Sequence, residues 1–207
     1  MLSSIHPLGE RARHNSWAVT ATAFTVGSIL TAAAIGAALG TAGSLLDVST
    51  SVTLASIAVT TLAAGALDLG RVRAPGPARQ VDERWIDTYR GWVYGLAFGA
   101  QLGAGVVTFV VTWGVWATFV AELLSGTPLT GAVIGAVFGA GRAVGLIATV
   151  RIDRPSRLTA FHERMRRLAV PAHRFAGIGT VTVGAAVVGA LLLGGWGDGF
   201  FALWSRG

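Results

Sequence analysis

Five long apolar runs constrain this chain more than any other feature of its sequence. Each is close to or longer than the roughly 20 residues that a helix needs to cross about 30 Å of hydrocarbon. The runs do not alternate polar and apolar residues as barrel strands must, and unpaired backbone is too costly in lipid, so helices remain. We therefore predict an all-α, polytopic membrane protein with five spans, at residues 17–40, 51–70, 92–124, 129–150 and 175–196.

The low charge of the chain supports this class. Charged residues make up 13% of the 207 residues, against about 25% in an ordinary soluble domain. The chain has no cysteine, which excludes disulfides, thiolate metal sites and thiol electron relay. The first apolar run is longer than the roughly 7–15 residues of a signal-peptide core, so we expect it to remain as the first helix.

The arginines predict the orientation in the membrane. All sixteen basic residues are arginine, and with five spans nearly all of them fall on one side. Because arginine-rich short loops stay in the cytoplasm, we expect a multi-pass protein of the bacterial inner membrane with a cytoplasmic N-terminus and an external C-terminus.

Two basic, proline-containing passages form the predicted cytoplasmic connections. "RVRAPGPARQVDERW" (71–85) aligns without gaps with "RIDRPSRLTAFHERM" (151–165), so that Glu83 and Arg84 match Glu163 and Arg164. Apolar residues recur at helical spacing in both, which predicts two short amphipathic helices in the headgroup layer, over about 79–90 and 157–167. The two Glu–Arg pairs are interpreted either as contacts to a cytoplasmic partner or as solvated ion pairs.

The flanking hairpins extend this similarity into an internal repeat. "WAVTATAF" opens the first span and "WVYGLAFG" opens the third, and each is followed by a long helix, a short outer loop, a second helix and a basic passage. We predict one transmembrane domain over residues 1–207, with parallel two-helix units at about 17–91 and 92–174 and a final helix at about 175–196.

Glycines are spaced every four residues within several spans. Small residues at this spacing let membrane helices approach closely, so packing is the favoured interpretation, within the chain or in a homo- or hetero-oligomer. The alternative is that these glycines let helices slide or bend around a solute path. The clearest ladders are Gly95, Gly99 and Gly103, and Gly131, Gly135 and Gly139.

Two deep polar residues are the main candidates for a pathway. Arg142 and Gln101 lie roughly 12–14 Å from the inner ends of their predicted spans, at 1.5 Å per residue. A charge at such depth costs about 3 kcal/mol, so Arg142 should face water or a partner, unless its long stem lets the guanidinium reach the interface.

The remaining polar candidates lie nearer the helix ends. Asp68 is interpreted as an interfacial partner for Arg71 or Arg142. Thr108 and Thr112 could line a path, although threonine more often bonds its own helix backbone. Glu122 is interpreted as a solvated loop acid, and His6, His14, His162 and His173 as surface residues.

The sequence offers no set of residues for catalysis. It contains no nucleophile–base pair, paired membrane carboxylates, phosphate loop or metal-ligand cluster, one of which chemistry would need. We therefore expect no enzyme activity, no cofactor and no metal. Nucleic acid is also an unnecessary partner, because the one-sided arginines already account for the basic charge.

Residues 97–145, "AFGAQLGAGVVTFVVTWGVWATFVAELLSGTPLTGAVIGAVFGAGRAVG", resemble the second half of small CcdA-type membrane proteins of the LysE/TauE exporter group. The redox cysteines of that family are absent here, so the resemblance implies a transporter-like bundle without thiol chemistry. Two functions remain open. One is a transporter or exporter of a small, anionic solute along Arg142 and Gln101. The other is a non-catalytic subunit or partner-binding component of a membrane complex.

Overall fold

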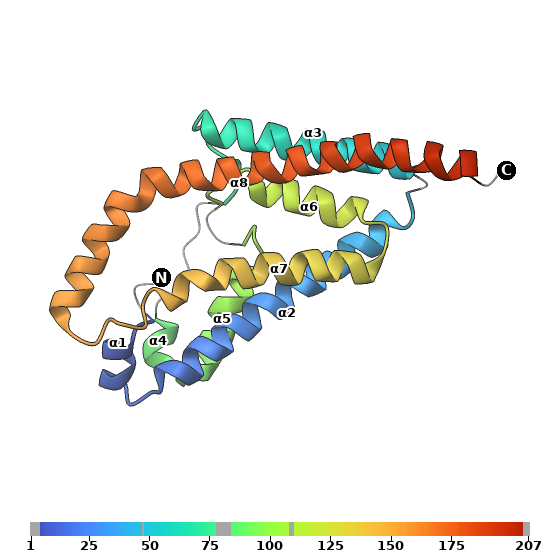
Figure 1. Cartoon of the computed structure of the whole chain (residues 1–207). Helices are drawn as coiled ribbons and strands as arrows, with labels where there is room; N and C mark the ends of the chain where they lie inside the picture. The colour runs from blue at the N-terminus through green and yellow to red at the C-terminus, as the bar shows by residue number, and fades with distance from the viewer. Residues whose placement is uncertain (1–4, 47, 78–83, 108–109, 205–207) are drawn as a thin grey trace.

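The chain is helical throughout the part that the structure, a computed structural model, describes: residues 5–46, 48–77, 84–107 and 110–204, without the side chains of 169–170 and 194–204. No strand occurs among these residues (Figure 1). The helices are α1 (Pro7–Ala12), α2 (Trp17–Gly43), α3 (Thr50–Leu69), α4 (Trp85–Thr88), α5 (Gly91–Gly103), α6 (Gly114–Leu124), α7 (Pro128–Ile147) and α8 (Pro155–Trp204).

Four helices are long and apolar enough to cross a membrane. They are α2, α3, α7 and the segment Pro171–Leu193 of α8, and they coincide with four of the five predicted runs. Local signals fix some of their ends: Thr127 accepts a hydrogen bond from the amide of Thr130 at the start of α7, where Pro128 occupies the first turn. The all-helical class is thus confirmed, whereas the number of spans and the repeat stay predictions.

The third predicted run is not one helix. It forms α5 and α6, separated by residues 104–113, where Gly105 adopts a positive φ of 74°. A 33-residue helix would be about 50 Å long, well beyond the hydrocarbon thickness, and the break removes that excess. The two pieces together still run the length of α2, because Gly95 of α5 meets Thr20 and Leu123 of α6 meets Gly43.

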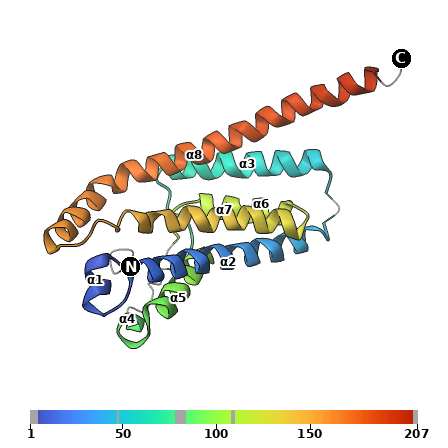
Figure 2. The ribbon, with the colours of Figure 1, turned by 60° about the horizontal axis from the view of Figure 1, so that its bottom comes forward.

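The helices form two layers (Figures 1 and 2). In the first, α2 is central, and α5 and α7 pack on different parts of its surface. In the second, α3 and α8 run antiparallel, with Gly65 against Val181 and Gly184 against Leu62. The short helix α6 lies between the layers and contacts both.

The glycine ladders are sites of close helix packing, and the helix they pack against is α2. A Cβ atom placed on Gly95, Gly99 or Gly103 of α5 would lie within 2.6 Å of a carbonyl oxygen of α2. The ladder on α7 has the same relation to another stretch of α2. Ser28 stands where the three helices meet, and its hydroxyl donates to the carbonyl of Gly139 at 2.8 Å. Such close approach is available only to glycine, since any side chain would hold the backbones apart.

The two basic passages differ from the prediction of paired interfacial helices. In the first, the described residues form only the single turn α4, and residues 78–83 lie outside the described part. In the second, residues 157–167 are helical but belong to α8, which continues through Pro171 into the last span. No glycine interrupts residues 155–170, and a proline inside a helix removes one hydrogen bond and bends the helix without having to end it.

Candidate functional site

A buried carboxylate joins three helices at the N-terminal end of α2. Glu10 of α1 is fully buried and accepts hydrogen bonds from Tyr94 of α5 at 2.5 and 2.6 Å and from Thr20 of α2 at 2.8 Å. The guanidinium of Arg13 completes the set at 2.7 Å. A buried charge is tolerated when its lone pairs are satisfied in this way. This Glu10 cluster is therefore a clamp that fixes α1 and α5 to α2.

The residues around the start of α1 dock on the chain that directly follows α7. The amide of Leu8 donates to the carbonyl of Ile152 at 3.0 Å, and the hydroxyl of Thr149 donates to the carbonyl of Ile5, also at 3.0 Å. His6 caps α1 through Nδ1 and is 8% exposed, so its expected place on the surface is wrong. Burial, together with the charge of Arg13, lowers the pKa of the His6 imidazole below its usual 6.5.

Asp68 holds the start of α6 after the helix break. Its carboxylate is 1% exposed and accepts hydrogen bonds from the amides of Trp113 at 2.8 Å and Gly114 at 3.4 Å. Free amides and a positive dipole end make a helix N-terminus a favourable place for a carboxylate. The structure thus gives Asp68 backbone partners in place of the arginines proposed from the sequence.

Two tryptophans reinforce the same junction. The indole N–H of Trp113 donates to the carbonyl of Val72 at 2.9 Å, and that of Trp116 donates to the carbonyl of Pro75 at 3.0 Å. Through these bonds the connection after α3 supports the chain where α6 begins. The break in the third run is therefore stabilised by contacts from another part of the chain.

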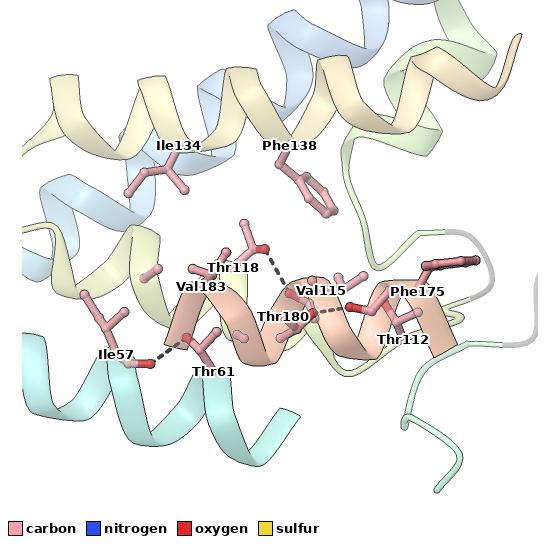
Figure 3. Close-up of a pocket in the computed structure, with 15 residues that line it drawn as sticks. Ile57, Thr61, Thr112, Val115, Thr118, Ile134, Phe138, Phe175, Thr180 and Val183 are labelled. Atoms are coloured by element: carbon pink, nitrogen blue, oxygen red, sulfur yellow. Dashed lines mark hydrogen bonds between the residues drawn. The ribbon is translucent and has the colours of Figure 1, made fainter. Parts of the chain in front are cut away.

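A pocket of about 460 Å³ lies between the two layers (Figure 3). Its volume falls within the roughly 300–1,000 Å³ of ordinary ligand sites. None of its described lining residues is ionisable. They come from four helices and the end of the break: Ile57 and Thr61; Thr112, Gly114, Val115, Ala117, Thr118 and Ala121; Ile134 and Phe138; Phe175, Ala176, Gly179, Thr180 and Val183.

The threonines of this pocket add little polarity. The hydroxyls of Thr61, Thr118 and Thr180 donate to the carbonyls four residues earlier in their own helices, at 2.6, 2.9 and 2.9 Å. Of the two threonines proposed as path residues, Thr112 lines the pocket, whereas Thr108 lies outside the described residues. The pocket therefore presents mainly hydrocarbon.

Arg142 stands one turn beyond the pocket on α7. Its guanidinium carbon lies 5.3 Å from the ring centroid of Phe138, which lines the pocket, in a cation–π arrangement. Within the described part of the chain it has no hydrogen bond or ion pair, either with Gln101 of α5 or with Asp68. The proposal that Arg142 and Gln101 share a pathway stays a prediction.

The ion pairs of the basic passages also differ from the Glu–Arg pairs proposed from the sequence. Glu163 is hydrogen-bonded to Arg166 and Arg167 of the same helix, the latter at 2.9 Å. These two arginines, rather than Arg164, neutralise the carboxylate and lower its pKa. Arg84 directly precedes α4 and makes no side-chain capping hydrogen bond to it, and Glu83 lies outside the described residues.

Glu122 is a buried acid that the sequence interpretation misplaced. It is 1% exposed in α6, and its Oε2 atom has no hydrogen-bond partner among the described residues. The expectation of a solvated loop acid is therefore wrong. The signal was its spacing, since Glu122 follows the buried Val115 by seven residues and so lies on the same helical face. No group of three metal-ligating side chains occurs in the described part of the chain.

The relatives found by comparison with known proteins share the same name. No family model matches the chain, and no solved structure matches it significantly. The methylamine utilization protein MauF of Paracoccus versutus is 33% identical over 173 residues, which are 79% of this chain and 63% of that protein. MauF of Methylophilus methylotrophus is 29% identical over 84% of this chain and 63% of its own length, and MauF of Methylobacillus flagellatus is 29% identical over 93% and 69%.

These relatives overturn the resemblance drawn from residues 97–145. They cover most of the chain and carry the name MauF, so the assignment to CcdA-type or LysE/TauE proteins is wrong. Glycine and alanine dominate that stretch, and small residues recur in closely packed membrane helices of many families. The chain spans about 63% of the length of the first two relatives.

Proposed function

We propose that this chain is a non-catalytic membrane component of methylamine utilization that binds a protein partner on the cytoplasmic side. The names of the three relatives support a role in methylamine utilization. The four apolar helices support insertion into a membrane, and the placement of the arginines supports binding on the cytoplasmic side.

The observation that carries the partner-binding role is the first part of α8, residues 155–168, which we call the basic arm. In both views it projects away from the two layers (Figures 1 and 2). The side chains of Arg166 and Arg167 are 80% and 76% exposed, and those of Met165 and Leu168 are exposed beside them. Exposed arginine beside apolar side chains is typical of interface residues.

Site-specific photocrosslinking tests this role in the native host. A photoreactive amino acid at Arg164, on the basic arm, should capture one defined protein in cells that grow on methylamine. The same amino acid at Val133, an exposed position of α7, should not capture that protein. Crosslinks from Arg164 to lipid alone would show that the arm lies on the membrane, as the amphipathic pattern predicted, and would contradict the partner role.

Growth experiments test the proposed role in methylamine utilization separately. Deletion of the gene should prevent growth on methylamine and leave growth on ammonium with another carbon source unchanged. Replacement of Arg164, Arg166 and Arg167 by Ala should reproduce the defect while the protein remains in the membrane at normal level. Normal growth of the deletion strain on methylamine would refute the proposed process.

Transport or export of a small, anionic solute is the second candidate. The broken helix pair α5–α6 favours it, because transporters commonly place interrupted helices at their binding sites. In proteoliposomes, flux of formate, phosphate or sulfate should then depend on the protein and be lost in Arg142→Leu. Equal leakage with and without protein for all three anions would remove this candidate.

A further inference from the structure

We propose that the pocket between the two layers, together with Arg142 beside it on α7, is a binding site for an anionic phospholipid. This inference goes beyond the partner-binding role and does not depend on it. An acyl chain occupies the pocket, and the lipid phosphate lies against the guanidinium group of Arg142.

The walls of the pocket suit a hydrocarbon chain. Its described lining residues are aliphatic, aromatic or small, apart from threonines. The hydroxyls of three of those threonines donate hydrogen bonds to the backbone of their own helices, so these residues offer methyl groups to a ligand. A polar solute would lose its hydration here without finding donors in exchange, which is unfavourable, whereas an acyl chain loses nothing.

Arg142 lies on the pocket face of α7, toward one end of the pocket. It follows the lining residue Phe138 by one helical turn, in the direction of the C-terminal end of α7. Arg174 precedes the lining residue Phe175, but residues adjacent in a helix point about 100° apart, and the other lining residues of α8 place Arg174 on the opposite face of that helix.

The guanidinium of Arg142 has no anionic partner in the described structure. Arg142 is partly buried and contacts the ring of Phe138. At five residues from the end of α7, Arg142 lies about 8 Å inside the helix terminus, within reach of a headgroup. Guanidinium groups bind phosphate with paired hydrogen bonds, and basic pockets between membrane helices on the cytoplasmic side recognise lipid headgroups. The unpaired charge of Arg142 is thus explained by a ligand that brings its own anion.

Native mass spectrometry of the full chain, delipidated in detergent and titrated with lipid, tests the site. Phosphatidylglycerol should bind more tightly than phosphatidylcholine with identical acyl chains, by about fivefold for one arginine near a membrane surface. The variant Arg142→Gln should bind the two lipids equally. A matched charge control, Arg174→Gln on the opposite face of α8, should keep the preference.

A second pair of variants tests the pocket itself. Gly179 lines the pocket and Gly189 does not, and a Cβ atom at either position meets nothing within 4 Å. Gly179→Leu should therefore fill the pocket and lose both lipids, whereas Gly189→Leu on the same helix should bind as the wild type does. Thermal unfolding of each variant checks its folding. If Gly179→Leu fails to fold, Arg142→Gln, which leaves the pocket open, decides the question.

Three results would overturn the proposal. Equal affinity of the wild type for the two lipids would remove the role of Arg142. Equal lipid binding by Gly179→Leu and Gly189→Leu would place the lipid elsewhere. Arginine-dependent binding of inorganic phosphate without lipid binding would make this a solute site and support the transport candidate instead.

Discussion

Substitution of Gly99 by alanine should strongly destabilise the protein, because it adds one carbon where two helices touch. A Cβ atom at Gly99 would lie 1.9 Å from the carbonyl oxygen and 2.7 Å from the carbonyl carbon of Phe24 on α2. Real Cβ atoms keep at least 3.0 Å, so the shortfall is 1.1 Å. The opposing atoms are backbone and cannot rotate away, so α5 must move outward as a unit.

The size of the effect follows from the neighbouring turns. Cβ atoms at Gly95 and Gly103 would likewise lie 2.6 and 2.2 Å from the carbonyl oxygens of Thr20 and Ser28, and a displaced α5 loses those contacts as well. Overpacking of this kind costs typically 1–3 kcal/mol, and we expect the upper part of that range. For a chain of about 200 residues, 1 kcal/mol corresponds to roughly 2–4 °C in the midpoint of thermal unfolding.

The matched control is Gly141→Ala on α7. A Cβ atom there meets nothing within 4 Å, so the free energy of unfolding should change by no more than about 0.5 kcal/mol. Both variants are compared with the wild type by thermal unfolding in one detergent. Equal unfolding midpoints for Gly99→Ala and Gly141→Ala would show that α5 does not pack on α2 as described.

Three further predictions concern the buried polar groups. Tyr94→Phe should cost about 1.5–3 kcal/mol in the free energy of unfolding, as expected for a hydrogen bond to the buried carboxylate of Glu10, whereas the exposed Tyr89→Phe should cost almost nothing. Asp68→Ala should cost about 1–2 kcal/mol through the lost cap of α6, and Asp68→Asn should retain most of that stability in the same unfolding assay. The folded state should lose stability as the pH falls below 6.5, because burial lowers the pKa of His6 and the unfolded chain then binds more protons; His6→Gln should remove this part of the pH dependence, and an unchanged pH profile would contradict it.

Much of the helical architecture was predictable because hydropathy encodes it locally. A run of about 20 apolar residues can satisfy its backbone in lipid only as a helix, so α2, α3 and α7 follow from their own residues. The glycine ladders likewise indicate close packing. The partner of each ladder was not predictable, since the spacing is the same whichever helix lies opposite. The structure shows that both main ladders face α2.

The break between α5 and α6 could not be located from the sequence. Hydropathy is continuous through residues 92–124, and excess length was the one sign that the run must deviate. What fixes the break is tertiary: Asp68 binds the first amides of α6, and Val72 and Pro75 accept from Trp113 and Trp116. These contacts join residues more than 40 positions apart, beyond the reach of any local pattern.

The residues of the candidate site also differ in whether the sequence could predict them. Arg142 was predictable because a charge within an apolar run is conspicuous, whatever it binds. The Glu10 cluster was not predictable, because Glu10 lies in a polar N-terminal stretch where an acidic residue is not unusual. Its hydrogen bond to Tyr94 spans 84 residues. A single sequence shows which residues are unusual for their surroundings, and it does not show which distant residues complete those surroundings.

These contacts make the layer of α2, α5 and α7 rigid and leave the layer of α3 and α8 freer to shift. In the layer of α2, α5 and α7, backbones touch at the glycines and the Glu10 cluster ties the ends, so these helices cannot shift without breaking many contacts at once. The layer of α3 and α8 meets them mainly through α6 and across the pocket. Packed helices move most easily where a void already separates them. A partner on the basic arm and a lipid in the pocket would both act on α8, so α8 is the element through which either ligand can influence the other.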